Sequence, residues 1–266
     1  MRFSPGKALQ DALYAGEMVV LVTGATSGFG LATAKRFLQD GAKVIGTGRR
    51  RNRLDELQRE LGSNFLPLAF DVGDRAKTEQ ALSSLPVGFK EVDILVNNAG
   101  GAIGLDPAYE ANVDDWEAMI RSNINGLLYC TRLLLPGMVQ RNRGHIINLG
   151  SVAAEWPYPG GNVYGGAKAF VHQFSNNLRA DLLGTAVRVT NIEPGLAGGT
   201  EFSNVRFKGD EKRAAAVYEG TQPLLPEDIA DAIHWVATRP AHVNINGVQM
   251  MPVCQAYGPL PVKRNK

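Results

Sequence analysis

Short apolar runs alternate with amphipathic stretches along the chain. Residues 18–24, MVVLVTG, form a continuous apolar run ending in glycine, as expected of a strand buried on both faces of a sheet. In residues 29–40 the apolar side chains instead recur every three or four positions, which indicates a helix. The same patterns predict further strands over residues 42–48, 64–72, 92–100, 144–151, 186–195 and 244–253. They predict further helices over residues 54–61, 75–84, 114–141 (with a kink or break at Pro136), 162–183, 211–219 and 226–238.

Seven strands that alternate with helices favour the α/β class, with a single Rossmann-type doubly wound domain around a seven-stranded parallel sheet. We expect residues 18–254 to form this domain. Its segment 196–225 is rich in glycine, charge and turn residues and is expected to be a mobile lid over the strand ends. Residues 255–266 would be a C-terminal tail. Residues 1–17 are either a short extra arm or the product of a start codon assigned too early, with Met18 the true start.

Composition and charge exclude several functional classes. The 266 residues are 44% hydrophobic and 20% charged, which is typical of a globular protein. The net charge is +2 and the basic residues are scattered, so a nucleic-acid partner is not expected. There is no 18-residue apolar run and no secretory signal, which argues against a membrane span and, with two unpaired cysteines, favours the cytoplasm. The cysteines lack metal-ligand spacing and the four histidines are scattered, so no metal site is predicted.

The first strand and first helix are joined by TGATSGFG, residues 23–30. Its glycines permit a tight turn and a close approach of the backbone to a pyrophosphate, which the helix N-terminus would face with free N–H groups. No GK[ST] follows, so a P-loop nucleotidase is unexpected. The pattern therefore predicts a dinucleotide site, and a glycine-rich turn without a ligand is the alternative.

Three consecutive arginines, Arg49, Arg50 and Arg51, follow the second predicted strand. An acid at this point would bind the ribose 2′-hydroxyl of NAD, whereas an arginine suits the 2′-phosphate of NADP. We therefore predict NADP(H), with Arg49 the first choice as phosphate ligand and Arg50 the second. Arg51 is expected to begin the next helix. The alternative is a solvated basic helix start.

The chain also contains YxxxK at the start of a long predicted helix. Tyr164 and Lys168 share one helical face, and a neighbouring cation should lower the Tyr pKa from about 10, which makes Tyr164 a plausible acid/base group. Ser151 lies 13 residues upstream, just past a strand end where it can hydrogen-bond a substrate oxygen. Alone, each motif would be an ordinary surface pair or loop serine, but together they predict a catalytic site.

Over residues 18 to about 253 the sequence resembles the short-chain dehydrogenase/reductase family. The resemblance implies that Asn123 completes a tetrad with Ser151, Tyr164 and Lys168 by holding a water in a proton relay. PGLAGGT departs from the family pattern, because Thr200 follows Pro194 one position later than usual. The predicted cofactor-binding set is Thr23, Gly24, Thr26, Ser27, Gly28, Phe29, Gly30, Arg49, Arg50, Asp71, Val72, Asn98, Ala99, Gly100, Tyr164, Lys168, Pro194, Gly195 and Thr200.

The resemblance also implies a reaction. NADPH would give hydride to a carbonyl carbon while Tyr164 protonates the oxygen, Ser151 steadies it, and Lys168 binds the ribose and lowers the Tyr pKa. The reverse reaction would oxidise an alcohol. Longer matches, in residues 156–170 and 193–210 among others, resemble NADP-dependent family members that act on serine, allo-threonine and 3-hydroxypropionate and reduce malonic semialdehyde.

A 3-hydroxy acid needs a cation or a cluster of N–H groups for its carboxylate, and the lid segment 196–210 offers Arg206 and Lys208. We expect Arg206 to bind it, beside Ser151 and Tyr164; the alternative is a solvated lid arginine. Trp156 and Tyr158 could wall the pocket, and a structural role is the alternative for Trp156.

Two other functions remain open. A reductase of neutral ketones or of carrier-bound 3-oxoacyl groups would need an open or apolar pocket without a carboxylate anchor. An NADP-binding protein without activity could lose the Tyr and Lys, which are both present here. The resemblance further implies a homotetramer built through the long helices.

Overall fold

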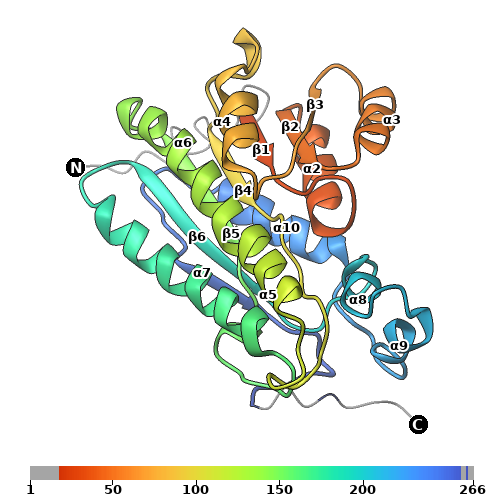
Figure 1. The fold of residues 1–266 in the computed structure, drawn as a ribbon. Helices are drawn as coiled ribbons and strands as arrows, with labels where there is room; N and C mark the ends of the chain where they lie inside the picture. The colour runs from red at the N-terminus through yellow and green to blue at the C-terminus, as the bar shows by residue number, and fades with distance from the viewer. Residues whose placement is uncertain (1–17, 259–261, 263–266) are drawn as a thin grey trace.

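Seven parallel strands form the sheet at the centre of the molecule (Figure 1). This computed structural model describes residues 18–258 and residue 262, so the predicted N-terminal arm lies outside the described residues. The strands are β1 (Val19–Val22), β2 (Lys43–Gly48), β3 (Phe65–Ala69), β4 (Ile94–Asn97), β5 (Gly144–Leu149), β6 (Val187–Pro194) and β7 (Gly247–Met250). Their order is β3-β2-β1-β4-β5-β6-β7, and every neighbouring pair is parallel. The predicted fold class is confirmed, although the strands are shorter than the apolar runs that predicted them.

Helices cover both faces of the sheet (Figure 1). On one face lie α2 (Gly28–Gln39), α3 (Arg51–Leu61) and α10 (Pro226–Ala237). On the other lie α4 (Arg75–Ser83), α6 (Gly126–Gln140) and α7 (Asn162–Asp181), with α5 (Val113–Ile120) beside α7. A hydrophobic core lies on each face of the sheet, between the strands and the apolar sides of the helices. Phe37 and Ile233 are fully buried on the first face, and Met138 is fully buried on the second.

The long helical region predicted over residues 114–141 is divided at a different place from Pro136. Pro136 lies inside α6, on its exposed side, where water can bond the carbonyl that a proline leaves unpaired. The irregularity is a π-helical turn at Arg121–Asn125, between α5 and α6. It includes Asn123, which is buried. Such turns are frequent at functional sites.

The predicted lid, residues 196–225, contains two short helices, α8 (Phe202–Arg206) and α9 (Glu211–Ala216). Helix α8 was not predicted, and α9 ends three residues before the predicted end. Gln255, the first residue of the predicted tail, contacts the base of the lid: its Oε1 accepts a hydrogen bond from Leu196 N at 2.6 Å.

The sheet reverses its winding between β1 and β4, which are neighbours. The loops after β1, β4, β5 and β6 therefore meet at the carboxyl edge, where open α/β sheets bind ligands. No helix in residues 18–258 is long and apolar enough to cross a membrane.

Candidate active site

A cavity of about 1010 Å³ lies at this carboxyl edge, between the strand ends and the lid. Most of the predicted site residues line it. They are Gly24, Thr26, Ser27, Gly28, Phe29, Arg49, Arg50, Asp71, Val72, Asn98, Gly100, Ser151, Tyr164, Lys168, Pro194, Gly195, Thr200 and Arg206. Four predicted residues, Thr23, Gly30, Ala99 and Asn123, are not in the lining and support it from behind.

The loop between β1 and α2, which we call the glycine loop, fits a pyrophosphate. Gly24 and Gly28 have φ of +70° and +53°, a conformation that favours glycine. A Cβ at Gly30 would lie 2.3 Å from the Gly24 carbonyl oxygen, so α2 can pack this close only with glycine. The side chain of Ser27, the N-cap of α2, makes no capping hydrogen bond, which leaves the first N–H groups of α2 open to an anion.

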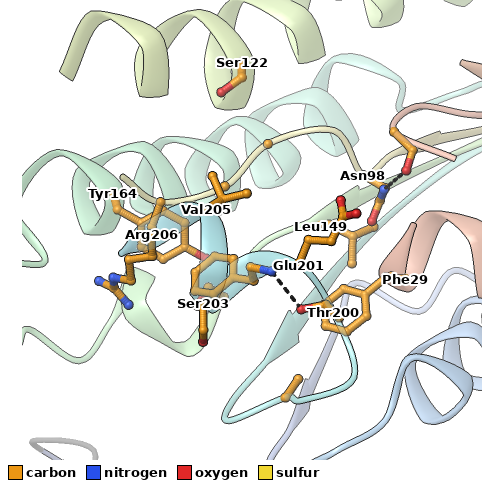
Figure 2. Close-up of a pocket in the computed structure, with 18 of the residues that line it drawn as sticks. Phe29, Asn98, Ser122, Leu149, Tyr164, Thr200, Glu201, Ser203, Val205 and Arg206 are labelled. Carbon is orange, nitrogen blue, oxygen red and sulfur yellow. Dashed lines mark hydrogen bonds between the residues drawn. The ribbon is translucent and has the colours of Figure 1, made fainter. Parts of the chain in front are cut away.

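Thr23 and Ala99 brace this loop against the end of β4. Thr23 Oγ1 accepts hydrogen bonds from the backbone N–H groups of Asn98 and Ala99, both at 2.9 Å. Asn98 Nδ2 donates to Thr23 O at 2.8 Å, and Figure 2 shows Asn98 held against this loop. Thr23 and Ala99 therefore support the cofactor half of the cavity, although neither of them lines it.

The three arginines have three different environments. Arg49 is exposed at the cavity and makes no hydrogen bond or ion pair with any described residue. Arg50 donates to Thr26 Oγ1 and Glu201 Oε1, both at 2.7 Å, and so binds the glycine loop and the lid. Arg51 begins α3, as predicted, and pairs with Asp55 one turn later.

The structure brings Ser151, Tyr164 and Lys168 together. Ser151 follows β5, whereas Tyr164 and Lys168 lie in the first two turns of α7, and all three are nearly buried. Lys168 Nζ donates to Leu149 O at 2.8 Å and lies 5.7 Å from the Tyr164 ring centroid. Ser151 Oγ accepts from Ala153 N at 3.1 Å, which leaves its proton for another acceptor.

The pKa shifts differ from the sequence expectation. Burial raises the pKa of Tyr164 to about 12, aided by Tyr158, while Ser151 and the Arg206 guanidinium act in the opposite direction. Burial also lowers the pKa of Lys168 to about 8. The net shift of the Tyr164 pKa is therefore opposite to the predicted direction, because desolvation by burial is its largest cause.

Asn123 supports the wall of the cavity from behind. Its Nδ2 donates to Gly101 O at 2.8 Å and to Met119 O at 2.9 Å. A Cβ at Gly100, whose φ is +151°, would lie 2.4 Å from Asn123 Oδ1, so Gly100 is required for this contact. Its predicted place in a proton relay stays a prediction.

The substrate half is dominated by one cation. The Arg206 guanidinium lies over three rings, 5.2 Å from the centroid of Tyr158, 5.7 Å from that of Phe202 and 5.8 Å from that of Tyr164. Figure 2 shows Arg206 beside Tyr164. Arg206 Nη2 donates to Tyr158 Oη, while the buried Nε has no hydrogen-bond partner among the described residues. Lys208, the other candidate cation in residues 196–210, does not line the cavity and pairs with Asp115 at 2.7 Å.

Thr200 reaches the glycine loop despite the extra residue in PGLAGGT. A Cβ at Gly28 would lie 3.1 Å from Thr200 Cγ2. Thr200 Oγ1 accepts a hydrogen bond from Phe202 N at 3.2 Å, which Figure 2 shows at the start of α8. Thr200 thus lies where the lid meets the glycine loop.

Two features near the site were missed in the sequence. Glu201 binds Arg50 from the lid, and no sequence pattern pointed to it. His172, one of the four scattered histidines, binds the buried Glu193 carboxylate at 2.7 Å. Glu155 lies close to this pair, and the ligand atoms of all three are within 4.8 Å of one another. The spacing of Tyr164, Lys168 and His172, four residues each, was a usable signal for His172.

A profile of the short chain dehydrogenase family matches residues 18–211. The chain belongs to this family. It is 62% identical over 248 residues to the NADP-dependent 3-hydroxy acid dehydrogenase YdfG of Salmonella typhi, covering 93% of this chain and 100% of that protein. It is 54% identical to the serine 3-dehydrogenase of Rhizobium radiobacter, covering 92% and 98%. A solved closed form of serine dehydrogenase complexed with NADP+ is similar at a TM-score of 0.90 and 61% identity, covering 93% and 100%.

Proposed function

We propose that this protein is an NADP-dependent oxidoreductase that transfers hydride between NADP(H) and the 3-hydroxyl or 3-oxo group of small 3-hydroxy acids. The observation that carries the substrate class is the Arg206 guanidinium above Tyr164, because it places a carboxylate-binding cation beside the proton-transfer group. Relatives that match over their whole length support it: one is named for 3-hydroxy acids and another for serine.

NADP is the cofactor, as the name of the 62% identical relative and the NADP+ complex of the similar structure indicate. The glycine loop and the α2 N-terminus would hold its pyrophosphate. Arg49 would bind its 2′-phosphate, since the guanidinium faces the cavity without another partner among the described residues. When bound, NADP supplies the hydride acceptor or donor.

The chain's own residues perform the remaining steps. In reduction, Tyr164 gives its proton to the substrate oxygen; a pKa near 12 keeps that proton in place at neutral pH. Ser151 donates a hydrogen bond to the same oxygen. In oxidation, Tyr164 must accept a proton, so the reaction should accelerate as the pH rises. Lys168 is protonated at neutral pH because its pKa is about 8, and it favours the charged phenolate electrostatically.

Arg206 would hold the substrate carboxylate. Tyr158 accepts from only one of the two N–H groups of Nη2, so the other can bind the carboxylate in parallel with the neighbouring N–H of Nε or Nη1. Serine, allo-threonine and 3-hydroxypropionate all place a hydroxyl carbon two bonds from the carboxylate carbon. The proposal therefore includes malonic semialdehyde reduction, the reverse of 3-hydroxypropionate oxidation. The finer proposal of a cytoplasmic location rests on the two free cysteines. The finer proposal of a homotetramer through the long helices rests on the family resemblance, and mass photometry tests it.

The decisive experiment is steady-state oxidation of L-serine, L-allo-threonine and 3-hydroxypropionate with NADP and with NAD, beside a Tyr164→Phe control. We expect turnover with NADP, little with NAD, and almost none in the control. Turnover of a neutral ketone with NADPH, and of none of these acids, would contradict the substrate class and favour the neutral-ketone or 3-oxoacyl alternative. NADPH binding without any turnover would favour the non-enzymatic alternative.

A further inference from the structure

One carboxylate of the lid, that of Glu201, contacts both the glycine loop and Arg50. Glu201 Oε2 accepts a hydrogen bond from Ser27 Oγ at 2.9 Å, and Oε1 accepts one from Arg50 Nη1 at 2.7 Å. Arg50 Nη2 in turn donates to Thr26 Oγ1 at 2.7 Å and to Ser27 Oγ at 3.2 Å. The hydrogen bond from Arg50 lowers the pKa of Glu201, so Glu201 remains a carboxylate at neutral pH. We call Arg50, Glu201 and Ser27 the lid latch.

The lid latch lies at the start of α8. Glu201 immediately precedes α8, and Phe202, its first residue, packs edge-on against Tyr164 with ring centroids 5.7 Å apart. Figure 2 shows Glu201 between the cofactor side, at Thr200, and the substrate side, at Arg206. Glu201 therefore connects the loop after β1 to the helix that carries Arg206.

The other end of α8 is also anchored. Arg206 O accepts a hydrogen bond from Gly104 N at 2.8 Å, and Lys208 pairs with Asp115 of α5 at 2.7 Å. Because α8 spans only Phe202–Arg206, anchors at both ends leave its orientation little freedom. One anchor is on the substrate wall, and the other is on the loop that would hold the cofactor.

We infer that Arg50 and Glu201 are positioning residues for the substrate cation: their ion pair holds α8 so that Arg206 stays over Tyr164. The inference rests on the proposed function, since it takes Arg206 as the carboxylate-binding group. It also separates the arginines by task. Arg49 would bind the 2′-phosphate, Arg50 holds the lid, and Arg51 belongs to α3. Closing the lid and ordering the glycine loop then become one event.

The test is a double-mutant cycle on Arg50→Met and Glu201→Gln, with KM and kcat for 3-hydroxypropionate and dissociation constants for NADPH and NADH. An exposed ion pair contributes modestly, so each single change should raise KM about two- to fivefold with a smaller change in kcat. The double variant should be no worse than either single one, because both remove the same interaction. The NADPH-to-NADH affinity ratio should stay within about twofold, whereas Arg49→Met should lower it at least tenfold.

The surface pair Lys35–Glu60 supplies a matched control. Its ions are also 2.7 Å apart and its side chains are 42% and 50% exposed, against 48% and 51% for Arg50 and Glu201. Neither residue lines the cavity. Lys35→Met and Glu60→Gln should leave KM and cofactor affinity unchanged.

Two results would overturn the inference. Additive effects of Arg50→Met and Glu201→Gln would mean that the pair does not act as a unit. A large loss of NADPH affinity in Arg50→Met, with NADH affinity and KM unchanged, would make Arg50 a phosphate ligand instead. If no 3-hydroxy acid is turned over even by the wild type, the proposed function fails separately. Cleavage by trypsin at Lys212 then decides about the lid latch: an unchanged rate in Glu201→Gln would contradict it, and a rise of a few fold would support it.

Discussion

The two sides of the cavity place their functional groups by different means. On the sheet side, Ser151, Tyr164 and Lys168 are 8%, 8% and 6% exposed and stand on a strand end and a 20-residue helix. On the lid side, Arg206 ends a helix of five residues, Glu201 immediately precedes that helix, and the Glu201 side chain is 51% exposed. Packing holds the first group, whereas a few polar contacts hold the second. Changes on the sheet side should therefore affect chemistry, and changes on the lid side should affect substrate affinity.

The largest effect should follow from Tyr164→Phe on the sheet side. The change removes the proton donor and leaves the ring in place, so kcat should fall about 10²- to 10⁴-fold. NADPH affinity, measured by fluorescence, should change less than about threefold. Tyr158→Phe is the matched control, since it removes a neighbouring phenol and should cost far less in kcat. A loss below tenfold in Tyr164→Phe would remove this residue from the proton transfer.

The buried ammonium of Lys168 should make stability depend on pH. Its pKa is about 8 in the folded protein and 10.5 ordinarily, so its contribution to stability is present above pH 10.5 and is lost as the pH falls through 8. The unfolding free energy of the wild type should therefore rise by about 3 kcal/mol more than that of Lys168→Met between these pH values. Tyr164, whose pKa is raised to about 12, adds stability that is lost only above pH 10.

Denaturant unfolding of both proteins at several pH values from 7.5 to 10 measures this difference. Lys35→Met, which removes an exposed lysine, should follow the wild-type curve. Parallel curves for the wild type and Lys168→Met would show that water reaches the ammonium and that burial does not shift its pKa.

On the lid side, Arg206→Ala should raise KM for 3-hydroxypropionate about 10- to 100-fold, because a charge-assisted bidentate pair contributes about 1.5–3 kcal/mol. The KM for a neutral ketone should change little, since no carboxylate is involved. Lys208→Ala removes a cation that is paired with Asp115 outside the cavity, and it should raise KM no more than about threefold. Equal effects on charged and neutral substrates would mean that Arg206 only shapes the pocket.

The same difference between the two sides explains what the sequence could predict. Gly30, Ser151 and Tyr164 lie in short motifs whose neighbours along the chain are also their neighbours in space, so the spacing alone brought them to the sheet edge. The predicted strand ends and helix starts differ from the observed ones by a few residues, because buried apolar runs extend past the hydrogen-bonded part of each strand.

The lid contacts join residues that are distant along the chain, and the sequence gives no sign of them. Glu201 and Arg50 are 151 positions apart, and Gln255 reaches Leu196 across 59 positions. The direction of the Tyr164 pKa shift was also missed, because desolvation depends on the packing around the phenol and not on the i, i+4 cation.

The smallest expected effects come from two glycine-to-alanine changes. They distinguish the influence of backbone conformation from that of the space around an added methyl group. An added Cβ meets nothing within 4 Å at Gly166, inside α7, or at Gly209, in the lid, where φ is +90°. Gly166→Ala should raise the unfolding free energy by about 0.5–1 kcal/mol, because alanine favours a helix. Gly209→Ala should instead strain the lid by about 1 kcal/mol and speed trypsin cleavage at Lys212 a few fold. Unchanged cleavage in Gly209→Ala would mean that the turn relaxes without cost and that the polar anchors, rather than this glycine, set the conformation of the lid.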